Sequence, residues 1–174
     1  EQAASLANQL LTFSKQHRVA ARRIEVNRVV RRTLELLRAT LPARIELKAD
    51  LVEQDLFIQA DETQLQQVLM NLCLNGRDAM PDGGLLHVRT AVVPGESGQV
   101  RLTVRDHGTG IPEQVKAHLF DPFFSTKEHG TGLGLAVVQQ IVESQDGRIE
   151  VFSEPGRGAC FEVSWSAATG AGSE

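Results

Sequence analysis

The chain has 174 residues, of which 41% are hydrophobic and 23% are charged, and its formal net charge is −4. This length and apolar content allow one substantial hydrophobic core. The chain contains no apolar run of the roughly eighteen residues that a membrane helix needs, and it opens with no signal-peptide pattern, so we predict a cytoplasmic domain without membrane contact.

The N-terminal part of the chain is predicted to be helical. A first helix is expected at about 2–17, where Leu6 and Leu10 recur at helical spacing, and a linker continues through Arg22. A second helix is expected from the cap-like Asn27 to residue 40.

The second helix lies in the basic part of the chain. Residues 1–50 carry ten Lys or Arg against five Asp or Glu, whereas residues 51–174 carry eight against seventeen. A basic run such as 28–32 lacks interleaved aromatic residues and any base-reading motif, so we interpret it as a solvated helix face and predict no nucleic-acid partner. Contact with an acidic protein partner is a separate hypothesis, which charge reversal at Arg31 and Arg32 would test.

The remaining elements alternate between strands and helices. Strands are predicted at 45–51, 57–60, 85–93, 100–105, 148–153 and 159–164, and helices at 62–80, 113–119 and 133–145. This order predicts an α+β fold, a two-layer α/β sandwich in which a mixed, mostly antiparallel sheet carries helices on one face, preceded by the helical segment. Residues 168–174 are small and polar and are predicted to form a disordered tail.

The predicted helix at 62–80 carries a row of polar side chains beside its apolar stripe. Asn71, Asn75 and Asp78 lie at i, i+4 and i+7, so they project next to a face that must be buried. Buried amides need partners, and a neutral amide oxygen suits Mg²⁺. Asn75 is the favoured magnesium ligand; the alternative is that both asparagines only hydrogen-bond a neighbouring loop.

The segment 106–112, of sequence DHGTGIP, combines an acid with two glycines. The glycines permit a close backbone approach to a ligand, and Asp106 supplies a carboxylate acceptor beside the turn. Such an acceptor selects adenine, whose exocyclic N6 is a donor, over guanine, which carries a carbonyl oxygen at that edge.

A second glycine-rich segment, 130–134, runs directly into an apolar segment with helical periodicity. The start of such a helix offers free backbone N–H groups and the positive end of the helix dipole to phosphates. Each glycine segment alone is more often a simple turn. Together with Asn75, the two segments predict one site for ATP, with the base at Asp106 and the phosphates at 130–134.

Five motifs in this order resemble those of the ATP-binding domain of two-component sensor histidine kinases. They lie within residues 43–167 and are NLCLNGRDAM at 71–80, DHGTG at 106–110, FDPFF at 120–124, GTGLGL at 130–135 and GRG at 156–158. Two of them, in the forms RDAM and DPFFSTK, are most similar to sensors related to nitrogen-regulation kinases. The resemblance implies the Bergerat fold, with ATP and Mg²⁺ as ligands.

The resemblance also implies roles for individual residues. Asn75 would bind Mg²⁺, and Asn71 and Lys127 would be the catalytic residues, the first near the phosphates and the second neutralising their charge. Lys127 belongs to a segment, 122–129, that corresponds to a mobile ATP lid anchored by two phenylalanines. The implied nucleotide-binding residues are Asn71, Asn75, Arg77, Asp78, Asp106, Gly108, Gly110, Ile111, Lys127, Gly130, Thr131, Gly132, Leu133, Gly134 and Leu135.

The implied reaction is phosphoryl transfer rather than hydrolysis. Asn71 stands where gyrase-like and chaperone-like relatives carry a glutamate that activates water, and an amide cannot accept a proton at neutral pH. The resemblance instead implies transfer of the γ-phosphate to a histidine, for relay to an aspartate of a response-regulator receiver domain.

None of the five histidines lies in the family's phosphoacceptor context. Residues 1–22 resemble the end of the second helix of the dimerisation hairpin, so we expect a fragment, with the catalytic domain at 23–167, that cannot autophosphorylate. The acceptor would lie on the dimerisation domain of the same chain or of its partner in a homodimer. The full-length protein is then either soluble or membrane-anchored.

Two positions depart from the family's pattern. Ala159 lacks the hydroxyl that usually follows the last glycine box, so we expect water to support Asp106. Asp78 and Ala79 stand where many sensor kinases carry a basic and an aromatic residue, which leaves Arg77 as the basic residue of this motif.

Two other functions remain open. The chain is alternatively a regulatory ATP-binding module without turnover, or an anti-sigma-type serine kinase of the same fold. A chain that includes the acceptor helix, incubated with labelled ATP and Mg²⁺, separates the three: acid-labile label indicates the histidine kinase, acid-stable label the serine kinase, and no label the regulatory module.

Overall fold

The computed structural model describes residues 21–94, 98–127 and 130–168. Its helices are α2 (Val26–Thr40), α3 (Glu62–Asp78), α4 (Glu113–Lys116) and α5 (Gly134–Ser144). Its strands are β1 (Arg22–Glu25), β2 (Ile45–Asp50), β3 (Phe57–Ala60), β4 (Gly84–Val93), β5 (Gln99–Asp106), β6 (Arg148–Ser153) and β7 (Ala159–Ser166). The predicted helix at 2–17 lies outside the described residues.

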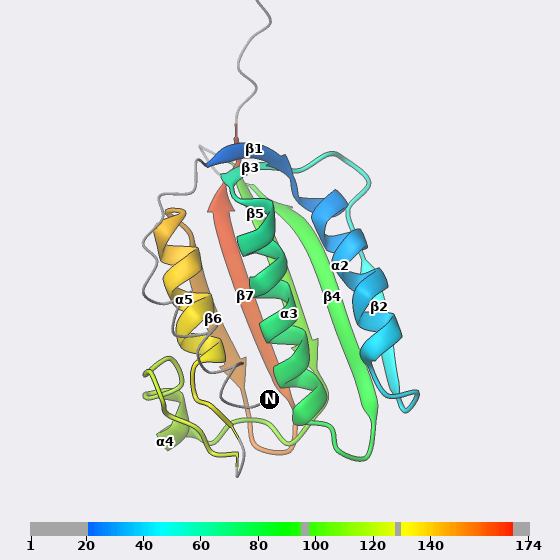
Figure 1. Ribbon diagram of the computed structural model, residues 1–174, viewed down its shortest axis with the longest axis vertical. Coiled ribbons are helices and arrows are strands. Elements are labelled where there is room, and N and C mark those ends of the chain that lie inside the picture. The colour runs from blue at the N-terminus through cyan, green and yellow to red at the C-terminus, as the bar shows by residue number, and fades with distance from the viewer. Residues whose placement is uncertain (1–20, 95–97, 128–129, 169–174) are drawn as a thin grey trace, which may run out of the picture.

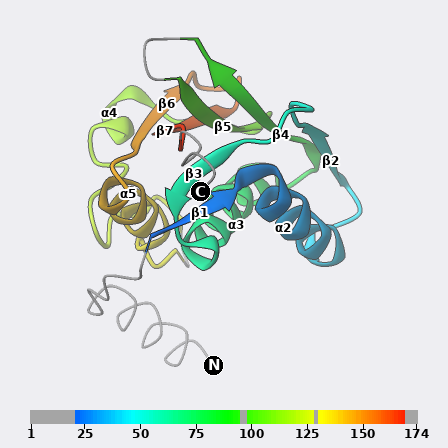
Figure 2. The ribbon, with the colours of Figure 1, turned by 90° about the horizontal axis from the view of Figure 1, so that it is seen from above.

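Five strands form one sheet in the order β2-β4-β5-β7-β6. The pair β2–β4 is parallel and the other three pairs are antiparallel. The helices α2, α3 and α5 cover one face of this sheet, as both ribbon views show (Figures 1 and 2). The predicted two-layer α/β sandwich with a mixed, mostly antiparallel sheet is therefore confirmed.

The strand pattern places both the core and one polar side chain. Successive side chains of a strand alternate between the two faces of a sheet. In β5, Val100, Leu102 and Val104 are buried in the core that the sheet forms with the helices, and Asp106 continues the same row. Asp106 is an even number of residues away from these apolar residues, so its carboxylate lies on the same buried face at the end of the strand.

The helix α3 packs over the middle of the sheet. Asp61 caps its first turn by accepting a hydrogen bond from the Gln64 N–H at 2.9 Å. Its buried stripe is close to the predicted one and consists of Leu65, Val68, Leu69, Leu72, Cys73 and Gly76. The C-terminal end of α3 and the N-terminal end of α5 lie at the same end of the molecule, the lower end in Figure 1.

The start of the domain differs from the prediction in two respects. The linker was expected to continue through Arg22, but Arg22 begins β1, which pairs antiparallel with β3. The cap of α2 is Glu25, whose carboxylate accepts from the N–H groups of Asn27 and Arg28. Asn27 is instead buried within the helix, where its side chain donates to the Val52 carbonyl at 2.9 Å.

The strands β3 and β6 have the predicted bounds, and the bounds of the other elements differ from the prediction by at most three residues. The helix predicted at 113–119 ends at Lys116, and the final strand, predicted to end at residue 164, runs to Ser166. Beyond it, the Ala168 N–H, in the predicted tail, donates to the Phe57 carbonyl at 2.7 Å, and residues 169–174 lie outside the described part. None of the helices in the described part of the chain has the length and apolar content to cross a bilayer.

Candidate functional site

Asp106 is buried at the end of β5, with 4% of its surface exposed. Its Oδ1 atom accepts hydrogen bonds from the N–H of Gly108 at 2.9 Å and from the N–H of Ala159 at 3.2 Å. Within the described ranges no hydrogen bond reaches Oδ2. One carboxylate oxygen is thus fixed by the backbone, and the other is available to a ligand.

Burial raises the pKa of the Asp106 carboxyl above its ordinary value of 3.8, although the bonds from Gly108 and Ala159 act in the opposite direction. An acid with a higher pKa in the folded state than in the unfolded state opposes folding when it ionises. Asp106 should therefore lower the free energy of unfolding as the pH rises from 3.8 through the folded pKa of this carboxyl.

This pH dependence is testable with Asp106→Asn, which cannot ionise. We expect the free energy of unfolding of the variant, minus that of the wild type, to increase with pH. The difference should level off above the folded pKa of Asp106. Urea denaturation of both proteins in parallel, from about pH 4 to about pH 8, measures this difference and cancels the titration of all other groups. A difference that does not change with pH would contradict the burial of an ionising carboxyl at this position.

The loop after β5 packs directly on the end of α3. A Cβ atom on Gly108 would overlap the carbonyl oxygen of Ala79, and that oxygen also accepts a hydrogen bond from the Thr109 N–H at 3.1 Å. Gly110 in turn lies against the carbonyl of Glu154. The loop is therefore held between α3 and the turn after β6, and the polar row of α3 reaches the same end of the sheet as the buried carboxylate.

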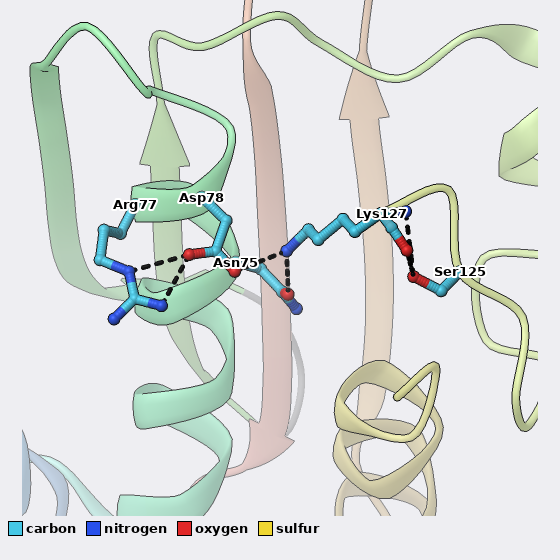
Figure 3. A network of polar contacts seen from close by, with 5 residues as sticks. All are labelled: Asn75, Arg77, Asp78, Ser125 and Lys127. Atoms are coloured by element: carbon cyan, nitrogen blue, oxygen red, sulfur yellow. Dashed lines mark hydrogen bonds and ion pairs between the residues drawn. The ribbon is translucent and has the colours of Figure 1, made fainter. Parts of the chain in front are cut away.

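The polar row of α3 contacts two other segments. The side-chain amide of Asn71 donates to the carbonyl of Gly134, the first residue of α5, at 3.2 Å. The ammonium group of Lys127 donates to Asn75 Oδ1 at 3.1 Å and to Asp78 Oδ2 at 2.9 Å (Figure 3). Polar groups that the sequence places 49 to 63 residues apart thus meet at α3.

The Asp78 carboxylate accepts hydrogen bonds from two cationic side chains, Arg77 and Lys127. Arg77 donates to its Oδ1 from Nε at 2.8 Å and from Nη2 at 2.6 Å, while Lys127 occupies Oδ2. Burial raises the pKa of the Asp78 carboxyl, but the hydrogen bonds from Lys127 and Arg77 outweigh burial and hold the pKa below its ordinary value. Asp78 is therefore ionised at neutral pH.

Among the residues that the structure describes, no side chain caps the N-terminal end of α5. Its cap residue Leu133 has a buried side chain, so only its backbone can face a ligand, and its N–H is 3.4 Å from the Thr131 hydroxyl. Gly134 opens the helix, and apart from its chain neighbours no atom outside this helix in the described part of the chain lies within 4 Å of a Cβ placed on it, while Leu135 packs against the core. Uncapped N–H groups at a helix start attract an anion, and the phosphate site at this segment stays a prediction.

The segment before α5 carries an exposed aromatic side chain. Phe123 is 66% exposed and has a positive φ of 66°, and its N–H donates to the Gly132 carbonyl at 2.9 Å. Phe124 packs against His118, with 5.6 Å between the ring centroids. Phe123 is thus attached through its backbone and not by burial of its ring, while Phe120 packs against the core. Residues 128 and 129 of the predicted lid lie outside the described part.

Backbone groups around Asp106 supply support that the sequence did not reveal. The Ala159 N–H donates to Asp106 directly, which residue type did not reveal, and the support of Asp106 by water stays a prediction. Ser153, which the sequence did not identify, holds the surrounding loops together: its hydroxyl accepts from the Ile111 N–H at 2.8 Å and donates to the Gly158 carbonyl at 2.7 Å.

The residues present fit a nucleotide with a magnesium ion. A free carboxylate oxygen suits a base with an exocyclic amine, and the uncapped start of α5 and Lys127 suit phosphates. In the described part, no group of three His, Cys, Asp or Glu side chains is placed to hold a metal ion. The amide oxygen of Asn75 is a single hard ligand, which is the kind of site that Mg²⁺ shares with phosphates and water.

Comparison with known proteins identifies an ATPase family and finds similarity to sensor kinases. The family described as histidine kinase-, DNA gyrase B-, and HSP90-like ATPase matches residues 60–169. The sensor kinase CckA of Brucella abortus is 39% identical over 92% of this chain, and the signal transduction histidine-protein kinase AtoS of Escherichia coli is 36% identical over 89%. The chain spans only 18% of CckA and 25% of AtoS.

Solved structures share the fold. The catalytic domain of histidine kinase ThkA has a TM-score of 0.74 at 29% identity and covers 84% of this chain and 95% of that domain. Full-length ShkA in complex with AMPPNP has a TM-score of 0.85 at 27% identity, covering 98% of this chain and 37% of that chain. The histidine kinase ThkA in complex with the response regulator TrrA has a TM-score of 0.78 at 25% identity, covering 97% and 48%.

Proposed function

Because this chain belongs to the histidine kinase-, DNA gyrase B-, and HSP90-like ATPase family, we propose that it is the ATP-binding catalytic domain of a two-component sensor histidine kinase. The observation that carries the proposal is the set of contacts at one end of the sheet. Hydrogen bonds link the polar row on α3 to Lys127 and to the start of α5, and the loop that follows the buried Asp106 packs against the end of α3.

Each of these groups binds a different part of the nucleotide. Asp106 Oδ2 accepts from the adenine amine, because Oδ1 is already occupied by two backbone donors. The first N–H groups of α5 and the Lys127 ammonium bind the phosphates. Asn75 holds Mg²⁺, which neutralises phosphate charge when bound. The structure of a relative, ShkA, in complex with AMPPNP supports nucleotide binding at this fold.

The arrangement favours phosphoryl transfer over hydrolysis. The Asn71 amide donates to Gly134 and has no basic atom with which to activate water. Positioning and charge neutralisation are sufficient for phosphoryl transfer to a nucleophile supplied from elsewhere. We place that nucleophile on a histidine of a dimerisation helix, in the same or a partner chain.

The proposed setting is a cytoplasmic phosphorelay. We assign residues 1–21 to the end of the dimerisation hairpin with its linker, 22–167 to the catalytic domain, which begins with β1 at Arg22, and 168–174 to a tail. The acceptor histidine passes its phosphoryl group to an aspartate of a response regulator, and the complex of the relative ThkA with the response regulator TrrA supports that class of partner. The full-length protein is a homodimer.

ATP with Mg²⁺ should raise the melting temperature of this chain, and GTP should not. A ligand that binds only the folded state stabilises it by RT ln(1 + [L]/Kd), which is about 2.7 kcal/mol at a hundredfold excess over Kd. Differential scanning fluorimetry with ATP, GTP and no nucleotide measures the shift. An equal response to ATP and GTP, or no response to ATP, would contradict the assignment of Asp106 to adenine.

The chemical step requires a second experiment. A longer chain that includes the predicted dimerisation hairpin is incubated with Mg²⁺ and ATP labelled on the γ-phosphate, and the label on the protein is tested for stability in acid. Acid-labile label supports the histidine kinase. Acid-stable label would indicate a serine kinase of this fold, and tight ATP binding without label would indicate a regulatory module.

A further inference from the structure

Lys127 occupies the amide oxygen that we assign to magnesium. Its ammonium group donates to Asn75 Oδ1 at 3.1 Å and to Asp78 Oδ2 at 2.9 Å, so the two acceptors on α3 share one cation (Figure 3). Arg77 holds the other oxygen of Asp78 through two hydrogen bonds and fixes the direction of the carboxylate. A positive charge therefore lies at the place proposed for the metal.

The backbone around Lys127 is also fixed. The Ser125 hydroxyl accepts a hydrogen bond from the Lys127 N–H at 3.1 Å, and the Gly130 N–H donates to the Lys127 carbonyl at 3.2 Å. Both ends of this residue are thus anchored, the backbone in a local turn and the ammonium on α3. Release of the ammonium moves only the flexible side chain, so it leaves this turn intact.

An ammonium group and Mg²⁺ compete for the same oxygen. Mg²⁺ binds a ligand oxygen at about 2.1 Å, and two cations on one amide oxygen would repel each other strongly. Lys127 must leave Asn75 when the metal binds, and the phosphates offer the departing ammonium a new acceptor. Mg·ATP therefore replaces one cation by another and does not fill an empty position.

We propose that Asp78 is a positioning residue that holds Lys127 on the magnesium oxygen of Asn75 until Mg·ATP displaces the ammonium. The inference deepens the proposed function and rests on its assignment of Asn75 to magnesium. Asp78 thereby opposes nucleotide binding and keeps the lysine close to where the phosphates arrive.

Asp78→Asn tests the proposal, because the neutral amide holds the ammonium less tightly. We expect the half-saturating Mg²⁺ concentration for ATP-dependent stabilisation to fall roughly threefold or more. The carboxylate also repels phosphates directly, so the same substitution is repeated in a Lys127→Met background. In that background, Asp78→Asn should lower the half-saturating Mg²⁺ concentration only by the part that comes from direct repulsion between the Asp78 carboxylate and the phosphates. An equal fall in both backgrounds would overturn the proposal.

Asp82→Asn is the matched control for charge. Asp82 is exposed and follows α3, so its substitution makes the same charge change near the same helix end without touching Lys127. We expect no change in the half-saturating Mg²⁺ concentration. A fall as large as that in Asp78→Asn would mean that general charge accounts for the effect, and would overturn the proposal.

A second readout needs no nucleotide. Amine-reactive labelling followed by mass spectrometry reports the reactivity of the Lys127 ammonium, with Lys48 as an internal reference on the sheet. Asp78→Asn should increase the labelling rate of Lys127 relative to Lys48. Normal Mg·ATP binding with unchanged Lys127 labelling in Asp78→Asn would contradict the inference alone. Failure of the unmodified chain to bind Mg·ATP would contradict the proposed function instead.

Discussion

Asp106→Asn is expected to remove most of the stabilisation that ATP gives this domain while leaving the fold intact. Both internal hydrogen bonds of Asp106 fall on Oδ1, and asparagine keeps an oxygen for them. Oδ2 becomes an NH₂ group that presents a donor to the donating amine of adenine. The lost charge-assisted bond and the unpaired donors together weaken ATP binding on the order of a hundredfold, equivalent to about 2.7 kcal/mol.

Isothermal titration calorimetry with ATP and GTP, together with the melting temperature without nucleotide, measures this effect. The carbonyl oxygen of guanine accepts from an amide, so the preference for ATP over GTP should narrow in the variant. Asp50→Asn is the control, because Asp50 is an exposed carboxylate on β2 that pairs with His87. Retained ATP affinity in Asp106→Asn would show that the base is read elsewhere.

The sequence predicted the fold because local pattern and packing agree. The strands β3 and β6 have the predicted bounds, and the α3 stripe faces the sheet as expected. In these elements one face is apolar, so the period of the pattern decides both the type of element and its orientation. The family resemblance is confirmed, and the subgroup related to nitrogen-regulation kinases stays a prediction.

The start of the domain was not predictable from local pattern. β1 has the sequence RRIE, with one apolar residue, and its partner β3 lies more than thirty residues further along the chain. What stabilises it is tertiary: the Arg23 guanidinium stacks over the Phe57 ring at 3.4 Å from the centroid. Asn27 was predicted as a cap from its residue type, but the burial of its side chain against Val52 depends on the same tertiary packing.

Within the site, the sequence identified residue types better than contacts. Asp106, Asn71 and Asn75 stood out because carboxylates and amides beside apolar rows need partners. The N–H of Ala159 carries no residue-type signal, since every residue except proline has one. The contact of Lys127 with Asp78 joins segments 49 residues apart and depends on how the chain closes over α3.

Gly158→Ala is expected to destabilise the domain and to weaken nucleotide binding at the same time. Gly158 has a φ of +75°, and a Cβ atom there would overlap the carbonyl oxygen of Asp106. The left-handed backbone costs an alanine about 1 kcal/mol, and forcing backbone apart in a packed region costs roughly 1–3 kcal/mol more. The shift would also disturb the bond from the Ala159 N–H that fixes Asp106.

Gly156→Ala separates the two costs. Gly156 has nearly the same φ, +78°, but among the described residues no atom lies within 4 Å of a Cβ placed there. The two substitutions therefore share the backbone strain and the change in the unfolded chain, and differ only in the overlap. Urea denaturation should show a loss of about 1 kcal/mol for Gly156→Ala and clearly more for Gly158→Ala. Equal losses in the free energy of unfolding would mean that the end of β5 and the start of β7 can move apart without cost. Asp106 would then not be held by close backbone packing.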